Sequence, residues 1–200
     1  YQQISNFCIN YLEGLLVSLL HMHIDQDLEP EYDTYLPLQQ ALRKRERSIV
    51  HAFQYQIEKR FKSFRSVGRS RLHNSRSSDW QSLGLAGYSS SKIKSTIESI
   101  SDKHQKRHEE LLLNLDKYLK TLVHRFDADL ADNPVTPNNI CNAFLASIET
   151  LNLNSNKTIK LFELFDRILQ RHLEHFYIHI ELGIRDLDLL PELDDPASFI

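Results

Sequence analysis

Cys141 lies among prolines and asparagines in the stretch NPVTPNNICNAF, residues 133–144, where a thiol could act as a nucleophile. The same stretch also has the pattern of a helix start. Thr136 is a good N-terminal cap, and Pro137 would occupy the first helical position, where proline is favoured. The apolar stripe that follows contains Ile140, Cys141, Phe144, Leu145, Ile148 and Leu151. We therefore predict that Cys141 is a small, inert side chain on the buried face of a short helix.

Two histidines, His104 and His108, stand four residues apart within an apolar stripe. Imidazoles at this spacing share one helix face, so they could bind a metal or titrate near neutral pH. The alternative is a pair of hydrogen-bonded histidines where a helix crosses a polar gap. We favour this alternative because no H-E-x-x-H or Glu-x-x-His pattern completes a ligand set.

A second group of histidines, His172, His175 and His179, falls within about 60° of one helix face at 100° per residue. With a carboxylate from a neighbouring helix, they could hold zinc. They flank the apolar stripe instead of centring on it, which is typical of residues at the edge of a buried face. We predict no metal site, and these five histidines are the weak candidates.

The most strongly charged segment runs from residue 43 to residue 76 and holds eleven Lys or Arg against two Glu. Its candidate partner- or anion-binding residues are Arg43, Lys44, Arg45, Arg47, Lys59, Arg60, Lys62, Arg65, Arg69 and Arg71. Phe61 and Phe64 are interleaved with them and could stack on bases, but they also fit a buried stripe. The Arg-x-x-x-Arg spacing within RKRER could hold a phosphorylated nucleotide. A surface for a protein partner is the alternative, and we favour it.

Catalytic chemistry has no evident set of residues in this sequence. The sequence contains no triad constellation, metal motif or paired carboxylates in a distinctive setting. Asp166 and Arg167 in the stretch FDRI are expected to form an interhelical ion pair. We expect no enzymatic activity and no cofactor.

The elements that position these residues are expected to be helices. The chain of 200 residues has 41% hydrophobic residues, 26% charged residues, five Gly and six Pro, and its net charge is −3. This composition is typical of a globular domain that is rich in helix. Apolar residues at three- and four-residue spacing predict helices over about 4–28, from near Pro37 to 64, and over 157–182. Ser155 is expected to cap the start of the last helix, and Gly183 is expected to end it.

The longest predicted helix runs from about residue 90 to residue 126, with a capping box at Ser95 and Glu98. Its stripe follows an eleven-residue repeat, which indicates a long, nearly straight helix of about 50 Å. We predict an all-α, elongated bundle of about five helices around this one. The expected organisation is a hairpin at 1–66, a Ser/Arg/Gly-rich loop at 67–91, and helices at 92–200 that complete the same domain.

Several stretches resemble a proteobacterial family of unknown function, number sixteen-thirty-one, whose members are often labelled thymidine phosphorylase. They are NPVTPNNICNAF, IKLFELFDRILQRHLEHFY, DLLPEL and LPLQQALRKRERSIVHAF. Thr136 departs from the pattern, since a glycine is expected before the second proline. The resemblance implies the N-terminal helical region of a long cytoplasmic protein, with no established activity. The phosphorylase label finds no support in the sequence, because there is no glycine-rich turn after a strand that could bind phosphate.

We predict a non-catalytic interaction module, scaffolding or regulatory, from the N-terminal part of a larger bacterial protein, since the sequence begins at Tyr1. The partner is expected to be a protein, which could be a second copy of the chain. The alternative is binding of nucleic acid or of a phosphorylated nucleotide, such as a cyclic dinucleotide, through residues 43–76. Two isolated cysteines, Cys8 and Cys141, fit a cytoplasmic location, and no stretch is long enough to span a membrane.

Overall fold

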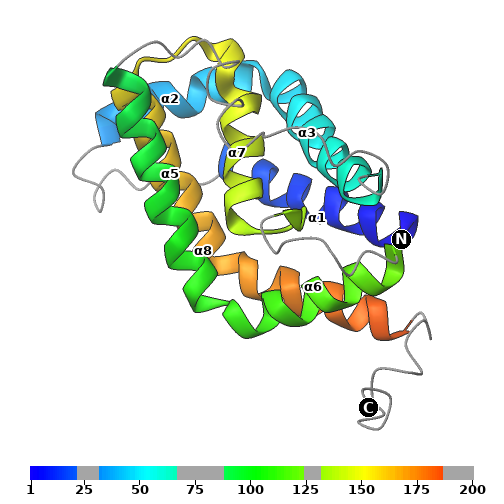
Figure 1. Cartoon of the computed structure of the whole chain (residues 1–200). Helices are drawn as coiled ribbons and strands as arrows, with labels where there is room; N and C mark the ends of the chain where they lie inside the picture. The colour runs from blue at the N-terminus through cyan, green and yellow to red at the C-terminus, as the bar shows by residue number, and fades with distance from the viewer. Residues whose placement is uncertain (22–31, 67–87, 124–131, 187–200) are drawn as a thin grey trace, which may run out of the picture.

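Stripes of apolar residues and few helix breakers make the helix the favoured state along most of this chain. The computed structural model describes residues 1–21, 32–66, 88–123 and 132–186, and all its regular structure there is helical. Figure 1 shows the helices packed around one another. The prediction of an all-α bundle is confirmed. The helices are α1 (Gln2–Leu20), α2 (Tyr32–Lys44), α3 (Glu46–Ser66), α5 (Tyr88–Arg107), α6 (Glu109–Val123), α7 (Pro137–Ile148), α8 (Ser155–Asp186) and the short 3-10 helix η2 (Glu149–Leu151).

The long helix predicted over residues 90–126 is wrong as a single straight rod. The chain turns at His108, which separates α5 from α6, and Figure 1 shows the two helices pointing in different directions. Helical hydrogen bonds flank the turn: the His108 N–H donates to the His104 carbonyl at 3.1 Å, and the Leu112 N–H donates to the His108 carbonyl at 2.9 Å. The apolar stripe therefore continues through a bend that lets both helices follow the same core.

The second predicted helix is also divided, at Arg45, between α2 and α3. The Arg45 N–H bonds the Leu42 carbonyl at 3.0 Å, three residues back, so the backbone tightens there before α3 begins. Pro37 lies inside α2. The central long helix of the bundle is α8, with 32 residues, and not the helix that the eleven-residue repeat predicted.

Three predicted helix ends are wrong. Ser95 and Glu98 form no capping box because α5 already begins at Tyr88, so residues 88–91 are helical and not part of the loop. The cap of α8 is Asn154, whose side chain accepts from the Lys157 N–H at 3.0 Å; Ser155 is already in the helix. Gly183 lies within α8 and does not end it. Its neighbours continue the helix because Ile184 is fully buried and anchors the next turn.

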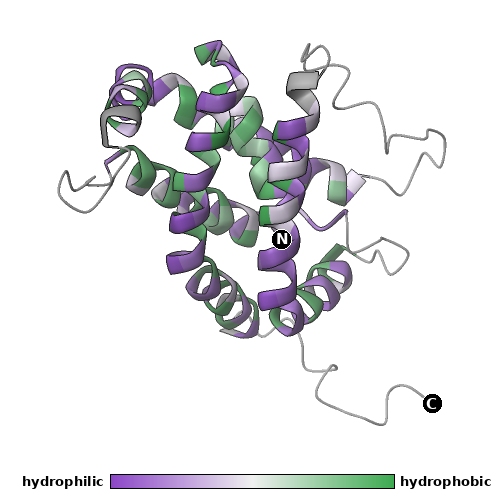
Figure 2. Ribbon diagram, turned by 90° about the vertical axis from the view of Figure 1, so that its left-hand side faces the viewer, coloured by the Kyte–Doolittle hydropathy of each residue, from purple (hydrophilic) through white to green (hydrophobic). Residues whose placement is uncertain are grey.

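Packing brings together helices from opposite ends of the chain. α8 contacts α1, α2, α5 and α6, while α7 lies between α3 and α5 (Figure 1). Hydrophilic and hydrophobic residues alternate along the ribbons in Figure 2, as expected of amphipathic helices. The buried apolar side chains form a single cluster with members from all seven α-helices described. At its centre the Phe144 ring stacks on Phe165 at 4.2 Å and meets Phe162 edge-on at 5.2 Å.

Candidate functional site

The stretch that contains Cys141 starts a helix, as predicted. The Thr136 side chain accepts a hydrogen bond from the Asn139 N–H at 3.3 Å, and Pro137 follows at the first helical position. Cys141 is fully buried on α7, and burial raises the pKa of its thiol to about 12. A thiol with that pKa is protonated at neutral pH, and its position gives a substrate no access. Cys141 is therefore a packing residue.

A polar network surrounds this helix start and was not predicted. Arg60 of α3 donates to the Asn139 side-chain oxygen at 2.7 Å, and the Asn139 amide donates to the Asn133 carbonyl at 2.7 Å. The Asn133 side chain in turn accepts from the Val135 N–H at 3.1 Å. Arg60, a candidate partner-binding residue, thus points inward and joins α3 to α7. The asparagines on either side of the two prolines were the available signal for this network.

His104 and His108 are both buried, at 0% and 3% exposure, on the inner side of the bend between α5 and α6. Their rings lie parallel with centroids 6.2 Å apart, and the His108 ring meets the Tyr177 ring edge-on at 5.6 Å. Burial, the charge of Arg107 and the proximity of His104 lower the pKa of His108. Nδ1 of His104 and Nε2 of His108 have no hydrogen-bond partner among the described residues. Within the described part of the chain, the side-chain hydrogen bond of this predicted pair is therefore the one made by His104 Nε2.

Asp166 of α8 is the partner of His104. Its Oδ1 lies 2.7 Å from His104 Nε2, and its Oδ2 accepts from Lys103 and, at 3.0 Å, from Gln170. Burial alone would raise the pKa of this carboxyl, but hydrogen bonds and charge from His104 and Lys103 lower it. The predicted interhelical ion pair at Asp166 is present, between α8 and α5. An Asp–His pair is half of a catalytic triad, but the cysteine and serine nearby, Cys141 and Ser101, are buried.

An open polar groove of about 660 Å³ lies between α5 and α8 beside this pair. Its carboxylates are engaged by neighbours: Glu163 accepts from the Tyr35 hydroxyl at 3.0 Å and pairs with Lys160 at 3.0 Å. Arg167 lies over the Tyr35 ring at 5.9 Å. The groove offers hydroxyls and amides to a polar ligand, without a nucleophile among its residues that a neighbouring base activates. It is lined by Ser95, Thr96, Ser99, Ile100, Glu163, Asp166, Arg167 and Gln170.

The three histidines of α8 lie at or near the surface. His175 and His179 are exposed and His172 is half-buried. The His179 ring lies 6.2 Å from Tyr11 of α1, and its Nδ1 is 2.6 Å from the His175 carbonyl. Within the described residues, no group of three His, Cys, Asp or Glu side chains is placed to hold a metal ion. The two histidine groups are also held apart, one at the α5–α6 bend and one beside α1.

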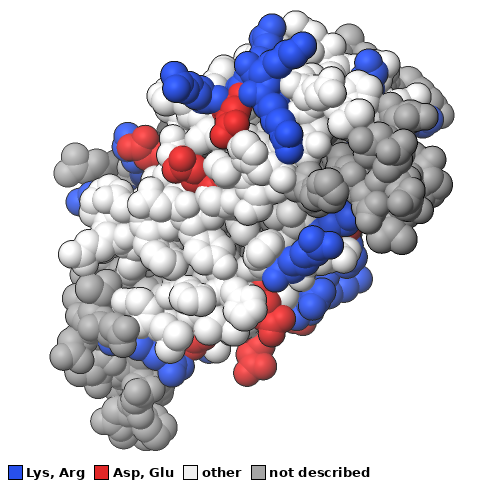
Figure 3. Space-filling model, turned by 180° about the vertical axis from the view of Figure 1, so that it is seen from behind, with Lys and Arg blue, Asp and Glu red and all other residues white. Residues whose placement is uncertain are grey.

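Four of the predicted basic residues meet where α2 ends and α3 begins. Arg43, Lys44, Arg45 and Arg47 are all exposed there, and we call them the basic junction. Figure 3 shows Lys and Arg gathered at the top of the molecule, where these two helices join in Figure 1. Arg43 Nε donates to the Leu20 carbonyl at 2.9 Å and Arg45 to the Thr150 carbonyl at 3.1 Å, so two of the four also brace the fold.

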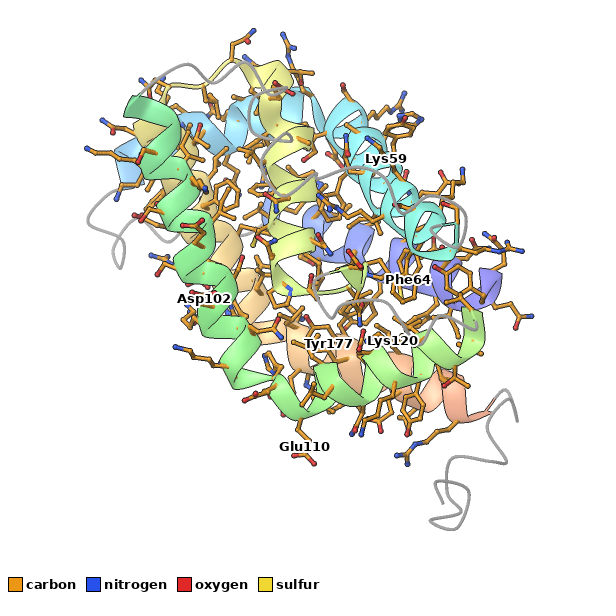
Figure 4. All side chains as sticks on the ribbon, viewed as in Figure 1. Lys59, Phe64, Asp102, Glu110, Lys120 and Tyr177 are labelled. Carbon is orange, nitrogen blue, oxygen red and sulfur yellow. The ribbon has the colours of Figure 1, made fainter. Side chains whose placement is uncertain are left out.

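The other basic candidates follow α3. Lys59, Lys62 and Arg65 are exposed, and Lys62 pairs with Glu58 at 2.7 Å. Figure 4 shows Lys59 on the outer side of α3, whereas the Phe64 ring lies inside. Phe61 and Phe64 are 1% and 2% exposed, so neither is available to stack on a base. Arg69 and Arg71 lie outside the described residues.

These helices and surfaces define an all-helical domain with two buried cysteines, a buried His104 bonded to Asp166, and exposed basic residues along α2 and α3. Residues 2–182 match a family model described as "Protein of unknown function (DUF1631) N-terminal domain". The chain belongs to this family, which confirms the resemblance. No curated protein and no solved structure matches the chain. Among the helices described, none is long and apolar enough to cross a membrane.

Proposed function

We propose that this domain is a non-catalytic protein-interaction module with a scaffolding or regulatory role, in the N-terminal part of a larger bacterial cytoplasmic protein. The basic junction is the observation that supports this most. Lys44 and Arg47 are exposed, and neither makes an ion pair or hydrogen bond with another described residue. Cations that have no partner among the described residues, at one end of a packed domain, favour a partner with complementary, acidic charge.

The junction is held in a fixed shape, which lowers the entropy cost of binding. Arg43 and Arg45 are tied to backbone carbonyls of α1 and of η2, so the backbone that carries Lys44 cannot move independently of the bundle. A preorganised cluster of cations binds an acidic segment more tightly than the same cations on a loose chain. This supports recognition of a defined protein surface.

Catalysis is less well supported than binding. Both cysteines are buried, and the carboxylates beside the α5–α8 groove are held by hydrogen bonds and ion pairs. A general base needs a free lone pair directed at a substrate. Asp166 directs its oxygens at Lys103, His104 and Gln170 instead.

Charge reversal at the junction tests the proposal. In pull-downs with the purified domain, Lys44→Glu together with Arg47→Glu is expected to reduce capture of acidic partners at least tenfold, while Arg43 and Arg45 keep their bonds. The matched control is Lys106→Glu with Lys117→Glu, the same charge change at exposed positions on α5 and α6. Equal capture by both double variants would count against the junction as the binding surface.

Binding of nucleic acid or a phosphorylated nucleotide is the second candidate. The observation that favours it is the series of exposed cations Lys59, Lys62 and Arg65, which continues along α3 from the junction. With both phenylalanines buried, such binding would be to phosphate and would weaken steeply with salt. Retention on a polyanion column at low salt that is lost by about 200 mM salt would support it. No retention at low salt would remove it.

A further inference from the structure

The outer face of α1 is unusual because it carries no charge. Glu13 is the only charged residue from Gln2 to Leu20, and it accepts from Gln54 of α3 at 2.6 Å, toward the flank of the helix. Six exposed residues fall on one stripe, which we call the α1 face: Gln3, Asn6, Phe7, Asn10, Gly14 and Ser18. α1 lies behind α7 in Figure 1, and Figure 3, seen from behind, shows a broad area without Lys, Arg, Asp or Glu below the basic group.

Gly14 lies within this stripe at a position where the described part of the chain does not require a glycine. A methyl group added at its Cα would meet no atom of the described residues within 4 Å, so none of the helices described requires a glycine there. Glycine inside a helix is less stable than alanine because its unfolded chain has more freedom. A glycine that the described helices do not require is explained if the backbone of another chain approaches the helix closely at that point.

The edge of the α1 face toward α8 is apolar. Phe7 is 38% exposed, although its ring contacts Tyr11 at 6.0 Å. Leu182, 52% exposed, lies one helical turn beyond His179, the residue whose ring contacts Tyr11. Exposed apolar side chains are therefore present on both α1 and α8, and on α8 the charged neighbours of Leu182, Glu181 and Arg185, pair with each other at 2.9 Å.

We propose that the α1 face is the contact between two copies of this chain, packed as antiparallel α1 helices about a two-fold axis near Asn10 and Gly14. In a two-fold interface each patch meets itself, so a charged patch would place like charges opposite each other. The α1 face avoids this. Its amides both donate and accept hydrogen bonds, so asparagine and glutamine can pair with their own copies.

Other occupants fit this surface less well. An acidic or basic partner finds no opposite charge on it. A lipid surface is normally met by cations beside the apolar residues, and the α1 face has none. The helix is about 28 Å long by its 1.5 Å rise per residue, so two such faces make a small interface. The dimer is therefore expected to dissociate on dilution.

Sedimentation velocity of the domain over a range of concentrations, about 1–300 µM, tests the proposal. The wild-type chain is expected to change from monomer to dimer across this range. Asn10→Lys places like charges across the axis and is expected to weaken dimerisation at least tenfold, and Asn10→Glu is expected to do the same. An equimolar mixture of the two variants is expected to restore dimers. Asn138→Lys, the same change at an exposed position on α7, is the matched control and leaves dimerisation unchanged.

The Gly14→Ala variant distinguishes a role of Gly14 in dimerisation from a role in folding stability. At a concentration where the chain is monomeric, the melting temperature is expected to rise by about 2–4 °C, since alanine stabilises the helix. In the same variant the dimer dissociation constant is expected to rise at least tenfold. A merely structural role for Gly14 would not give these two opposite changes.

Three results would overturn the proposal. They are a wild-type chain that is monomeric at 300 µM, a dimer that survives Asn10→Lys unchanged, and an equimolar mixture of the Asn10→Lys and Asn10→Glu variants that stays monomeric. Because Lys44 and Arg47 lie outside the α1 face, loss of dimerisation leaves the test of the basic junction unaffected. Failure of either proposal can thus be told from failure of the other.

Discussion

The thiol of Cys141 shows how burial decides the chemistry of a single residue. Its neighbours in the sequence, two prolines and several asparagines, are those of an exposed turn. In the fold, the side chain is fully buried and the pKa of the thiol is raised to about 12. Cys8 on α1 is equally enclosed, at 1% exposure, and burial raises the pKa of its thiol too. Neither thiol is available in the folded chain.

Thiol labelling checks this directly. With a reagent such as DTNB, both cysteines are expected to react at least about a thousand-fold more slowly in the native protein than in the unfolded chain, because reaction requires opening of the core. Two thiols per chain are expected to react in denaturant. Rapid labelling of one thiol under native conditions would show that its helix opens separately from the bundle.

Among the helices, the start of α8 offers a direct measurement. Asn154→Ala removes the acceptor for the Lys157 N–H and is expected to lower the free energy of unfolding by about 0.5–2 kcal/mol. Ser155→Ala, one residue on and already helical, is the matched control and is expected to change it by less than about 0.5 kcal/mol. Urea denaturation of the two variants beside wild type gives the comparison. The reverse order of effects would place the cap at Ser155.

The spacing of apolar residues predicted the helical class, the helix start at Thr136 and the burial of Cys141, because these depend on neighbours within a few residues. It missed the breaks at Arg45 and His108, since an apolar stripe runs through a bend unchanged. The bend at His108 coincides with contacts to α8 from residues far along the chain: Asp166 bonds His104 from 62 positions away, and Tyr177 meets His108 from 69 positions away.

The same limit applies to the candidate site. The basic residues of α2 and α3 could be identified from composition, and those of the basic junction do lie together on the surface. Arg60 could not be separated from them, because its hydrogen-bond partner Asn139 is 79 positions away. The division into 1–66, 67–91 and 92–200 stays a prediction; residues 88–91, which it assigned to the loop, are helical.

At the scale of the whole molecule, stability is expected to fall as the solution becomes acidic. His108 has a lowered pKa in the fold, so below its ordinary pKa of 6.5 the unfolded chain takes up a proton first. Asp166 has a pKa below its ordinary 3.8, so its contribution is present above that pH and is lost as the pH falls further. Both groups therefore lower stability toward acid, the histidine first.

Urea midpoints between pH 7.5 and pH 4.5 measure the histidine part. For one proton, the free energy of unfolding changes by at most about 1.4 kcal/mol per pH unit. His108→Gln is expected to flatten the decline that begins near pH 6.5, while His51→Gln, at an exposed position on α3, leaves it unchanged. If stability declines identically in the wild type and in both variants, the decline arises from titratable groups other than His108.

The packing of α1 against α8 has a consequence for how the protein is made. α1 is synthesised before α8, so the part of its apolar face that packs on α8 has no partner until a helix that begins at Ser155 and ends at Asp186 is complete. At a synthesis rate of ~5–20 residues per second, this interval lasts roughly 10–30 s. During that time the nascent chain exposes an apolar helix, which makes α1 a natural binding segment for chaperones that act at the ribosome exit.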